Sequence, residues 1–209
     1  MIIRGPKEKI ERSLGQKLGL KAERGTSPKS ATLRKPYKPG QHGPGRKRRM
    51  GSFSDYSLQL KEKQKIKFTY GLKEKQLKEI FRKAINSRMG TREKLIDLLE
   101  RKLDNVVFRL GIAPSRPVAR KIIIDGHITV NHKKINYPHY QVKVQDIIGL
   151  SPASKEKGLF GKLPEILKKH DSPVWLTLDP EKIEGKVSSQ PTDVDLPFDY
   201  NSIVEFYSK

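Results

Sequence analysis

Apolar side chains recur at helical spacing between Thr91 and Gly111. In the run TREKLIDLLERKLDNVVFRLG, leucines and valines fall three and four positions apart. This spacing places them on one face of a helix with 3.6 residues per turn. Thr91 suits the N-cap, and Gly111 suits a left-handed C-terminal stop. The pattern therefore predicts one long amphipathic helix over this segment.

A second, shorter helix is predicted directly after the first. Ser115 can cap it, and Pro117 fits its first turn, where a missing N–H costs nothing. Arg116 and Arg120 lie four positions apart, so we expect them on one side of this helix, facing away from the core. The strand HITVN, the turn NHKK and further short strands follow. We therefore predict a two-helix corner beside a small antiparallel sheet.

Helical patterns also dominate residues 1–98. KEKIERSLGQKLGL predicts one short amphipathic helix. SFSDYSLQLKEKQKIKFTY, from Ser52 to about Tyr70, predicts another, with Tyr56 and Leu60 on its apolar side and lysines around the rest. Residues 72–89 predict a third, which ends at Gly90. We expect residues 1–98 to form a mostly helical domain.

Residues 24–54 form an arm that contains no acidic residue and nine Lys or Arg side chains. The prolines and glycines of KPYKPGQHGPGRKRR oppose a regular helix or strand. We expect the arm to be extended in the free protein. A flexible linker would fit the same pattern. Contact with RNA explains the uncompensated charge better, because glycines let the backbone approach phosphates closely.

The C-terminal residues 171–209 have the opposite charge balance. They hold three Lys or Arg and eight Asp or Glu, a net charge of −5, whereas residues 1–170 hold 41 basic and 15 acidic side chains, a net charge of +26. VWLTLD predicts a strand with Trp175 buried, and the apolar end IVEFYSK must also be buried. We expect this tail to pack on the N-terminal domain. The predicted fold is α+β, with domains 1–98 and 99–170 followed by the tail.

The charge balance narrows the class of partner. A body this basic needs a polyanion, either nucleic acid or an anionic membrane. No run of about 18 apolar residues exists, and MIIRGPKEKIERS lacks the apolar core of a signal peptide. The basic helices carry apolar faces only where their own core needs them, which argues against a membrane surface. The absence of cysteine excludes disulfides and thiolate-bound zinc and fits a cytosolic protein.

Catalytic motifs are absent from the sequence. The five histidines show no metal-ligand spacing, and no GxxxxGK[ST] loop occurs. Asp104 follows the apolar face of the first predicted helix, where it is better placed to orient Arg101 or a neighbouring N–H group than to act in catalysis. An enzyme that modifies RNA would need a set of catalytic side chains, and the sequence shows none. We therefore predict a binding protein without enzymatic activity.

The run from Leu98 to Ile148 resembles the S-four RNA-binding domain. The residues that carry this resemblance are Arg101, Leu103, Asp104, Val107, Arg109, Ser115, Arg116, Ala119, Arg120, Gly126, Val130, Asn131 and Asp146. PGQHG at 39–43, SDYSLQLKEKQKIKFTYG at 54–71 and the terminal IVEFYSK are similar to the bacterial-type small ribosomal subunit protein family uS-four. The module also occurs in pseudouridine synthases and in a tyrosyl-tRNA synthetase tail. An RNA-modifying enzyme or accessory factor is therefore the alternative.

The resemblance implies a primary binder of 16S rRNA that docks at a multi-helix junction of the 5′ domain and nucleates assembly of the 30S subunit. It further implies neighbours uS-five and uS-three, a position near the mRNA entry channel and an effect on translational accuracy. The implied location is the cytoplasm or an organelle, in the ribosome, without a stable homo-oligomer. Some family members bind zinc through N-terminal cysteines. This chain has none, so we expect neither metal nor cofactor.

The predicted rRNA contacts combine the basic arm, the lysine-rich helix and the two-helix corner. Recognition is expected through phosphates and RNA shape rather than base edges, with release of condensed counterions. The predicted contact residues are Arg34, Lys35, Lys38, His42, Arg46, Lys47, Arg48, Arg49, Lys61, Lys63, Lys65, Arg101, Arg109, Ser115, Arg116, Arg120, Lys121, Asn131, Lys133 and Lys134.

Overall fold

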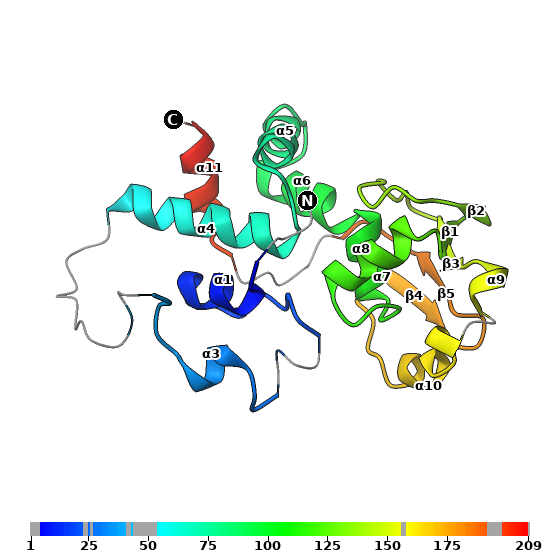
Figure 1. The fold of residues 1–209 in the computed structure, drawn as a ribbon. Helices are drawn as coiled ribbons and strands as arrows, with labels where there is room; N and C mark the ends of the chain where they lie inside the picture. Colours follow the sequence, from blue (N-terminus) through cyan, green and yellow to red (C-terminus); the bar gives the residue numbers. More distant parts are fainter. Residues whose placement is uncertain are drawn as a thin grey trace. The chain divides into compact units, whose positions relative to one another are not determined.

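A computed structural model describes residues 5–22, 25, 27–40, 43, 54–155, 158–191 and 198–208. The chain forms two compact units (Figure 1). The first comprises Met1–Ile85 with Asp195–Lys209, and the second comprises Asn86–Val194. Helices together with one antiparallel sheet confirm the predicted α+β class. Within the described ranges, each helix is too short or too polar to cross a membrane.

The first unit is helical among its described residues. Its helices are α1 (Lys7–Leu14), α3 (Ala31–Arg34), α4 (Asp55–Thr69), α5 (Glu74–Ile85) and α11 (Tyr200–Ser208). Three of them confirm predicted helices: α1 at the start of the chain, α4 before Tyr70 and α5 after residue 72. The sequence did not predict α3, which lies inside the basic arm. Its four residues precede the proline-rich run that opposes helix formation.

Helix α4 buries a different face from the predicted one. Tyr56 is 62% exposed, whereas Gln59, Lys63 and Ile66 are buried. The reason is the packing of α11 on α4. Gln59 Nε2 donates a hydrogen bond of 2.9 Å to Glu205 Oε2, and Lys63 Nζ lies 4.3 Å from the centre of the Phe206 ring. Polar side chains of α4 thus find partners on α11.

The C-terminal helix α11 joins the first unit through aromatic and aliphatic contacts. Ile203 is fully buried, whereas Val204 and Phe206 are half-buried, so the predicted burial of the apolar end is confirmed only for Ile203. The rings of Tyr207 and Phe81 stack with their centres 4.6 Å apart. Asp199 precedes the helix and accepts hydrogen bonds from the backbone N–H groups of Asn201 and Ser202, which caps its first turn.

The second unit begins with three helices, α6 (Thr91–Glu100), α7 (Leu103–Arg109) and α8 (Arg116–Ile124). The prediction of one continuous helix over residues 91–111 is wrong. Lys102 has extended backbone angles and forms a β-bridge with Gln141. Arg101 O accepts a hydrogen bond from Val142 N, and Leu103 N donates one to Tyr140 O. A neighbouring extended segment therefore takes the backbone groups that a continuous helix would have used.

Five antiparallel strands form the sheet of this unit, in the order β2-β1-β3-β5-β4. The strands are β1 (Ile128–Val130), β2 (Lys133–Lys134), β3 (Ile147–Leu150), β4 (Leu176–Asp179) and β5 (Glu184–Val187). Asn131 and His132 both have positive φ, at 49° and 64°, as a tight two-residue hairpin turn requires. Between β3 and β4 lie α9 (Pro152–Lys155), η1 (Gly158–Phe160) and α10 (Leu163–Lys168).

The C-terminal segment is divided between the two units, which corrects the predicted domain limits. Strands β4 and β5 pair with each other, and β5 pairs with β3, so residues 176–187 complete the sheet rather than packing on the helical domain. The last residues, Asp195–Lys209, which include α11, lie in the first unit. Hydrogen bonding across the β3 edge explains this placement. The first boundary falls after residue 85 rather than 98, since α6 belongs to the second unit.

The core of the second unit lies where α7 and α8 pack side by side with the sheet (Figure 1). Val106, Leu110 and Ile123 from the helices are buried in one cluster with Ile148 and Val187 from the strands. A side chain at Gly185 would overlap Leu110, so the absence of a Cβ there lets α7 lie directly on β5. Trp175 is 4% exposed, which confirms its predicted burial.

Candidate nucleic-acid interface

Two arginine–carboxylate pairs lie near the break between α6 and α7. Arg101 Nε lies 2.6 Å from Asp97 Oδ1, and Arg101 Nη2 donates to Asp97 Oδ2 at 3.0 Å. Arg109 forms the second pair, with bonds of 3.0 and 3.2 Å to the two oxygens of Glu100. Both carboxylates are buried. Arg101 therefore stabilises the last turn of α6, and Arg109 fastens α7 to α6.

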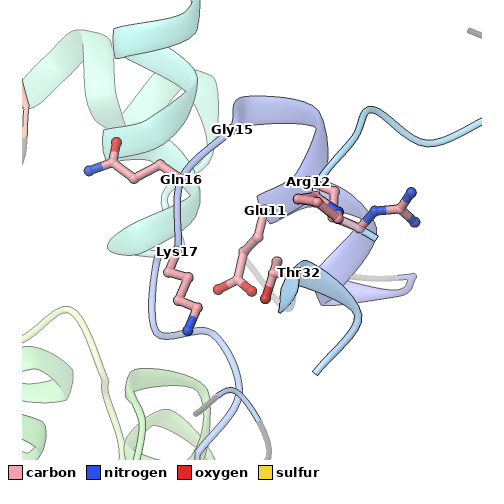
Figure 2. A pocket seen from close by; sticks show the side chains of 7 residues that line it. Glu11, Arg12, Gly15, Gln16, Lys17 and Thr32 are labelled. Atoms are coloured by element: carbon pink, nitrogen blue, oxygen red, sulfur yellow. The ribbon is translucent and has the colours of Figure 1, made fainter. Parts of the chain in front are cut away.

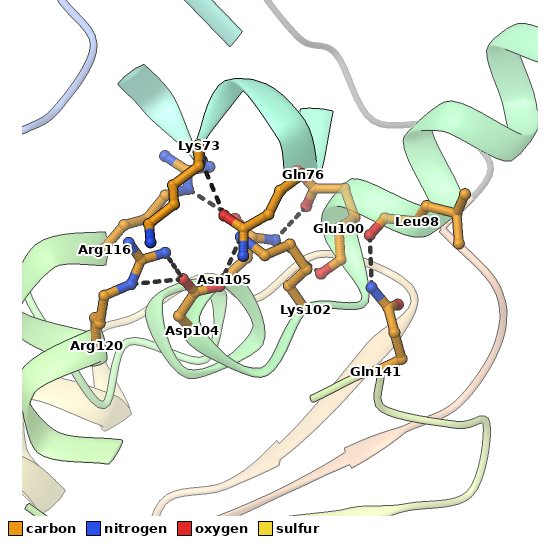
Figure 3. A network of polar contacts seen from close by, with 10 residues as sticks. All are labelled: Lys73, Gln76, Leu98, Glu100, Lys102, Asp104, Asn105, Arg116, Arg120 and Gln141. Carbon is orange, nitrogen blue, oxygen red and sulfur yellow. Dashed lines mark hydrogen bonds and ion pairs between the residues drawn. The ribbon is translucent and has the colours of Figure 1, made fainter. Parts of the chain in front are cut away.

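Arg120 lies inside a buried cluster of charges (Figure 3). Its guanidinium donates to Asp104 Oδ2 through Nε at 3.1 Å and through Nη2. Lys102 Nζ lies 3.3 Å from Asp104 Oδ1. Arg120 is 8% exposed, so the prediction that it faces away from the core is wrong. Asp104, in the first turn of α7, draws this face of α8 inward.

The cluster shifts the pKa values of its members. Burial acts to lower the pKa of Lys102, the charge of Asp104 opposes this effect and the charge of Arg120 adds to it, so that the pKa is lowered to about 8. Burial also acts to raise the pKa of Asp104. The charges of Lys102 and Arg120 outweigh that effect and hold the pKa of this carboxyl below its ordinary value. One carboxylate thus neutralises two cations only in part.

Lys102→Met is expected to flatten the pH dependence of stability above about pH 8. The folded protein releases the Lys102 proton near pH 8, whereas the unfolded chain keeps it to about pH 10.5, so stability should rise with pH between these values. The full shift corresponds to roughly 3 kcal/mol at the upper end. Urea unfolding at both ends of the range measures this rise. An equal rise in the variant would contradict the assignment to Lys102.

Arg116 is held on α7 by hydrogen bonding and by ring contact. Its Nε donates to Asn105 Oδ1 at 2.7 Å, and its guanidinium carbon lies 4.5 Å from the centre of the Phe108 ring. Asn105 Nδ2 donates in turn to Glu100 O and Glu100 Oε2, both at 2.9 Å (Figure 3). Arg116 remains partly exposed, but Ser115 beside it is buried. The network thus fixes the Arg116 side chain at the edge of the corner.

Three lysines next to this corner are exposed. They are Lys121 on α8 and Lys133 and Lys134 on β2, and we refer to them as the α8–β2 surface. The aliphatic stem of Lys134 lies over Gly126, directly after α8, so the two elements meet here. The side chain of Asn131, in the turn between β1 and β2, ties that turn to the start of β3. Its Nδ2 donates to Asp146 Oδ1 at 2.8 Å, and its Oδ1 accepts from Ile147 N at 2.9 Å.

The predicted contacts on α4 are engaged within the first unit. Lys63 is buried, with its Nζ 2.8 Å from Glu74 Oε1. Lys65 Nζ lies 2.5 Å from Glu62 Oε1, and Lys61 is half-buried. The prediction that Lys63 lies outside the core is therefore wrong, because Glu74 and the Phe206 ring cover it. The ion pairs of α4 stabilise the helical unit.

The basic arm is described only in part. Arg34, Lys35 and Lys38 are exposed. The remaining predicted arm contacts, His42, Arg46, Lys47, Arg48 and Arg49, lie outside the described residues. The exposed side chains of the arm supply positive charge in the first unit, as the α8–β2 surface does in the second.

A small hollow of about 160 Å³ lies in the first unit beside α1. Figure 2 shows Glu11 and Thr32 side by side at this hollow, with Lys17 nearby. Glu11 Oε1 accepts hydrogen bonds from Leu18 N at 3.0 Å and Leu20 N at 3.2 Å. Its carboxylate thus holds the loop after α1. In the described part of the chain, no three His, Asp or Glu side chains gather to hold a metal ion.

The two-helix corner, the small sheet and the exposed lysines are typical of a protein that binds nucleic acid. Residues 3–100 match the family described as Ribosomal protein S4/S9 N-terminal domain, and residues 101–148 match the S4 domain. These matches cover both sides of the α6–α7 break. The chain belongs to the small ribosomal subunit protein uS4 family.

Similar proteins extend over nearly the whole chain. A relative named small ribosomal subunit protein uS4, from Caldicellulosiruptor bescii, is 44% identical over 207 residues, which are 98% of each chain. Relatives with the same name come from Halothermothrix orenii, at 42% identity over 99% of this chain and 98% of its own, and from Roseiflexus castenholzii, at 44% over 98% of each. The family consists of structural ribosomal proteins and not enzymes, which removes the RNA-modifying enzyme as an alternative.

Proposed function

We propose that this protein binds 16S rRNA as a structural constituent of the small ribosomal subunit. The observation that carries the proposal is the α8–β2 surface, where three exposed lysines stand beside a corner fixed by buried ion pairs. Lysines on a rigid scaffold suit a fixed row of phosphates. The net charge of +26 over residues 1–170 supports the same partner.

The buried network and the exposed lysines have different roles in this proposal. Arg109 holds α7 to α6 and Arg120 holds α8 to α7 through buried carboxylates, whereas Arg101 pairs with Asp97 at the end of α6. Lys121, Lys133 and Lys134 contact phosphates and release condensed counterions. Arg116, partly exposed and held by Asn105, stands between the two groups. The exposed arm residues Arg34, Lys35 and Lys38 add phosphate contacts from the first unit, and we extend this role to the rest of the predicted arm residues.

The finer features of the function come from the family resemblance. We propose early binding at a multi-helix junction of the 5′ domain, which brings rRNA helices together because cations lower their mutual repulsion. Neighbours uS5 and uS3, a place near the mRNA entry channel and an effect on translational accuracy belong to the same proposal. We also propose that the protein acts in a cytoplasmic ribosome and forms no stable homo-oligomer.

Filter binding of the full chain to 16S rRNA and to tRNA over a salt series tests the function. We expect tighter binding to 16S rRNA at every salt concentration, because the arrangement of phosphates at a folded junction differs from that of tRNA. The logarithm of the affinity should fall linearly with the logarithm of the salt concentration. Equal or tighter binding to tRNA would contradict the proposal.

A further inference from the structure

An exposed aromatic pair lies on the loop that follows β2. The Tyr137 and His139 ring centres are 5.8 Å apart, and the ring planes are inclined by 74°. Tyr137 is 58% exposed, although an aromatic ring gains most when it is buried. The edge of one ring supports the other, so the Tyr137 ring is held in place while much of it faces solvent.

The loop that carries these rings is fastened to the start of α7. Asp104 N donates to Pro138 O at 3.1 Å, and Leu103 N donates to Tyr140 O at 2.9 Å. N–H groups in the first turn of a helix lack partners within the helix, and here the loop supplies them. Tyr140 N donates to Tyr137 O at 3.1 Å, which closes the turn. The loop therefore holds both rings beside the first turn of α7, which also carries Asp104 of the buried charge cluster.

The surroundings of the pair favour a negatively charged polymer as the ligand over a positively charged one. Burial, followed by the charge of Lys102, lowers the pKa of His139 to about 4, so its ring is neutral at pH 7. Among the described residues, the buried His139 Nδ1 has no hydrogen-bond partner. Lys133 and Lys134 are exposed on β2, a few residues before Tyr137. An uncharged aromatic surface therefore adjoins lysines suited to phosphates.

We propose that Tyr137, supported by His139, is a stacking platform for one unpaired base of the RNA that this corner binds. The inference rests on the proposed RNA binding and adds a ligand class, a single-stranded nucleotide, to a surface otherwise suited to backbone phosphates. Unpaired bases stack on aromatic rings in protein–RNA complexes, and neighbouring cations hold the adjoining phosphates. The bound RNA therefore presents a bulged or looped nucleotide at this corner.

Two substitutions of the full chain separate stacking from side-chain size. Tyr137→Leu removes the ring but keeps an apolar side chain, and we expect its affinity for a 16S rRNA transcript to fall about 5- to 100-fold. The salt slope should be unchanged, because no phosphate contact is lost. Tyr137→Phe keeps the ring and should bind as the wild type does. Since Tyr137 is exposed, equal melting temperatures of the three proteins verify that each is folded.

A fluorescent variant reports the stacking directly. In Tyr137→Trp the new indole is exposed, whereas the native Trp175 is 4% exposed and so nearly constant in signal. We expect the 16S rRNA transcript to quench the new indole and to protect it from acrylamide. Protection that appears only when other small-subunit proteins are added would place a protein on this surface and overturn the proposal.

The outcomes also separate this inference from the proposed function. If the wild-type chain fails to prefer 16S rRNA over tRNA, the proposed function fails, and the platform fails with it. If the wild type shows that preference but Tyr137→Leu binds equally tightly, the platform alone is overturned. A loss of affinity in both Tyr137→Leu and Tyr137→Phe would also contradict stacking, because the phenylalanine ring can still stack.

Discussion

Asp104→Asn is expected to lower the free energy of unfolding of the second unit by about 3–5 kcal/mol. The side chain keeps its shape but loses the charge that faces Lys102 and Arg120, so two buried cations remain without a counter-charge. Denaturant unfolding, with a probe such as Trp175 in the same unit, measures the loss. Asp171→Asn is the matched control, because Asp171 is exposed in the same unit and loses the same charge.

The pH dependence of the same variant tests the cause. The pKa of Asp104 in the folded protein lies below its ordinary value of 3.8, so its contribution to stability is present above that pH and is lost as the pH falls through the folded value. The asparagine variant should therefore lose less stability than the wild type on acidification below about pH 4. A loss equal to that of Asp171→Asn at neutral pH would contradict the role of the ion pairs.

Replacing Lys121, Lys133 and Lys134 together by glutamine is expected to weaken binding to 16S rRNA by about two to three orders of magnitude at 0.1 M salt. Each lost phosphate contact reduces the salt slope by roughly one, so the slope should fall by about two to three. The three side chains are exposed, so thermal stability should change little. Filter binding over a salt series yields both the affinity and the slope.

A second triple variant controls for net charge. Lys162, Lys168 and Lys169 lie on or beside α10 and are exposed in the same unit, so their replacement by glutamine removes the same charge elsewhere. We expect a clearly smaller effect on both quantities. Equal losses in the two variants would mean that total charge, and not the α8–β2 surface, determines the affinity.

Local pattern predicted most of the helices but not the break between α6 and α7. The apolar spacing continues across Arg101 and Lys102, so no residue in the run TREKLIDLLERKLDNVVFRLG marks an end. The break depends on residues 140–142, some forty positions further along, which supply the alternative hydrogen bonds. A pattern within a window of a few turns contains no information about such a partner.

The sequence predicted which basic residues gather at the candidate site, but not which of them form buried ion pairs and which are exposed. Spacing placed Arg116 and Arg120 on one side of a helix, and a helix pattern alone cannot tell which side meets a buried carboxylate. Asp104 provides that carboxylate from α7. Lys102 gave no signal at all, because a lysine between apolar positions of a helix pattern fits an ordinary solvent-exposed face. The exposed lysines on α8 and β2 were predicted, and their role in binding RNA stays a prediction.

The pairing of β5 with β3 determines where the chain can be cut. The match to the S4 domain ends at residue 148, inside β3, whereas the sheet continues through residues 176–187. A fragment ending near residue 150 would leave one side of β3 unpaired and uncover the Leu110 side chain that lies over Gly185. Unpaired strand edges recruit other chains. An excised RNA-binding module should therefore stay monomeric only when it extends past Val187, and shorter versions should aggregate.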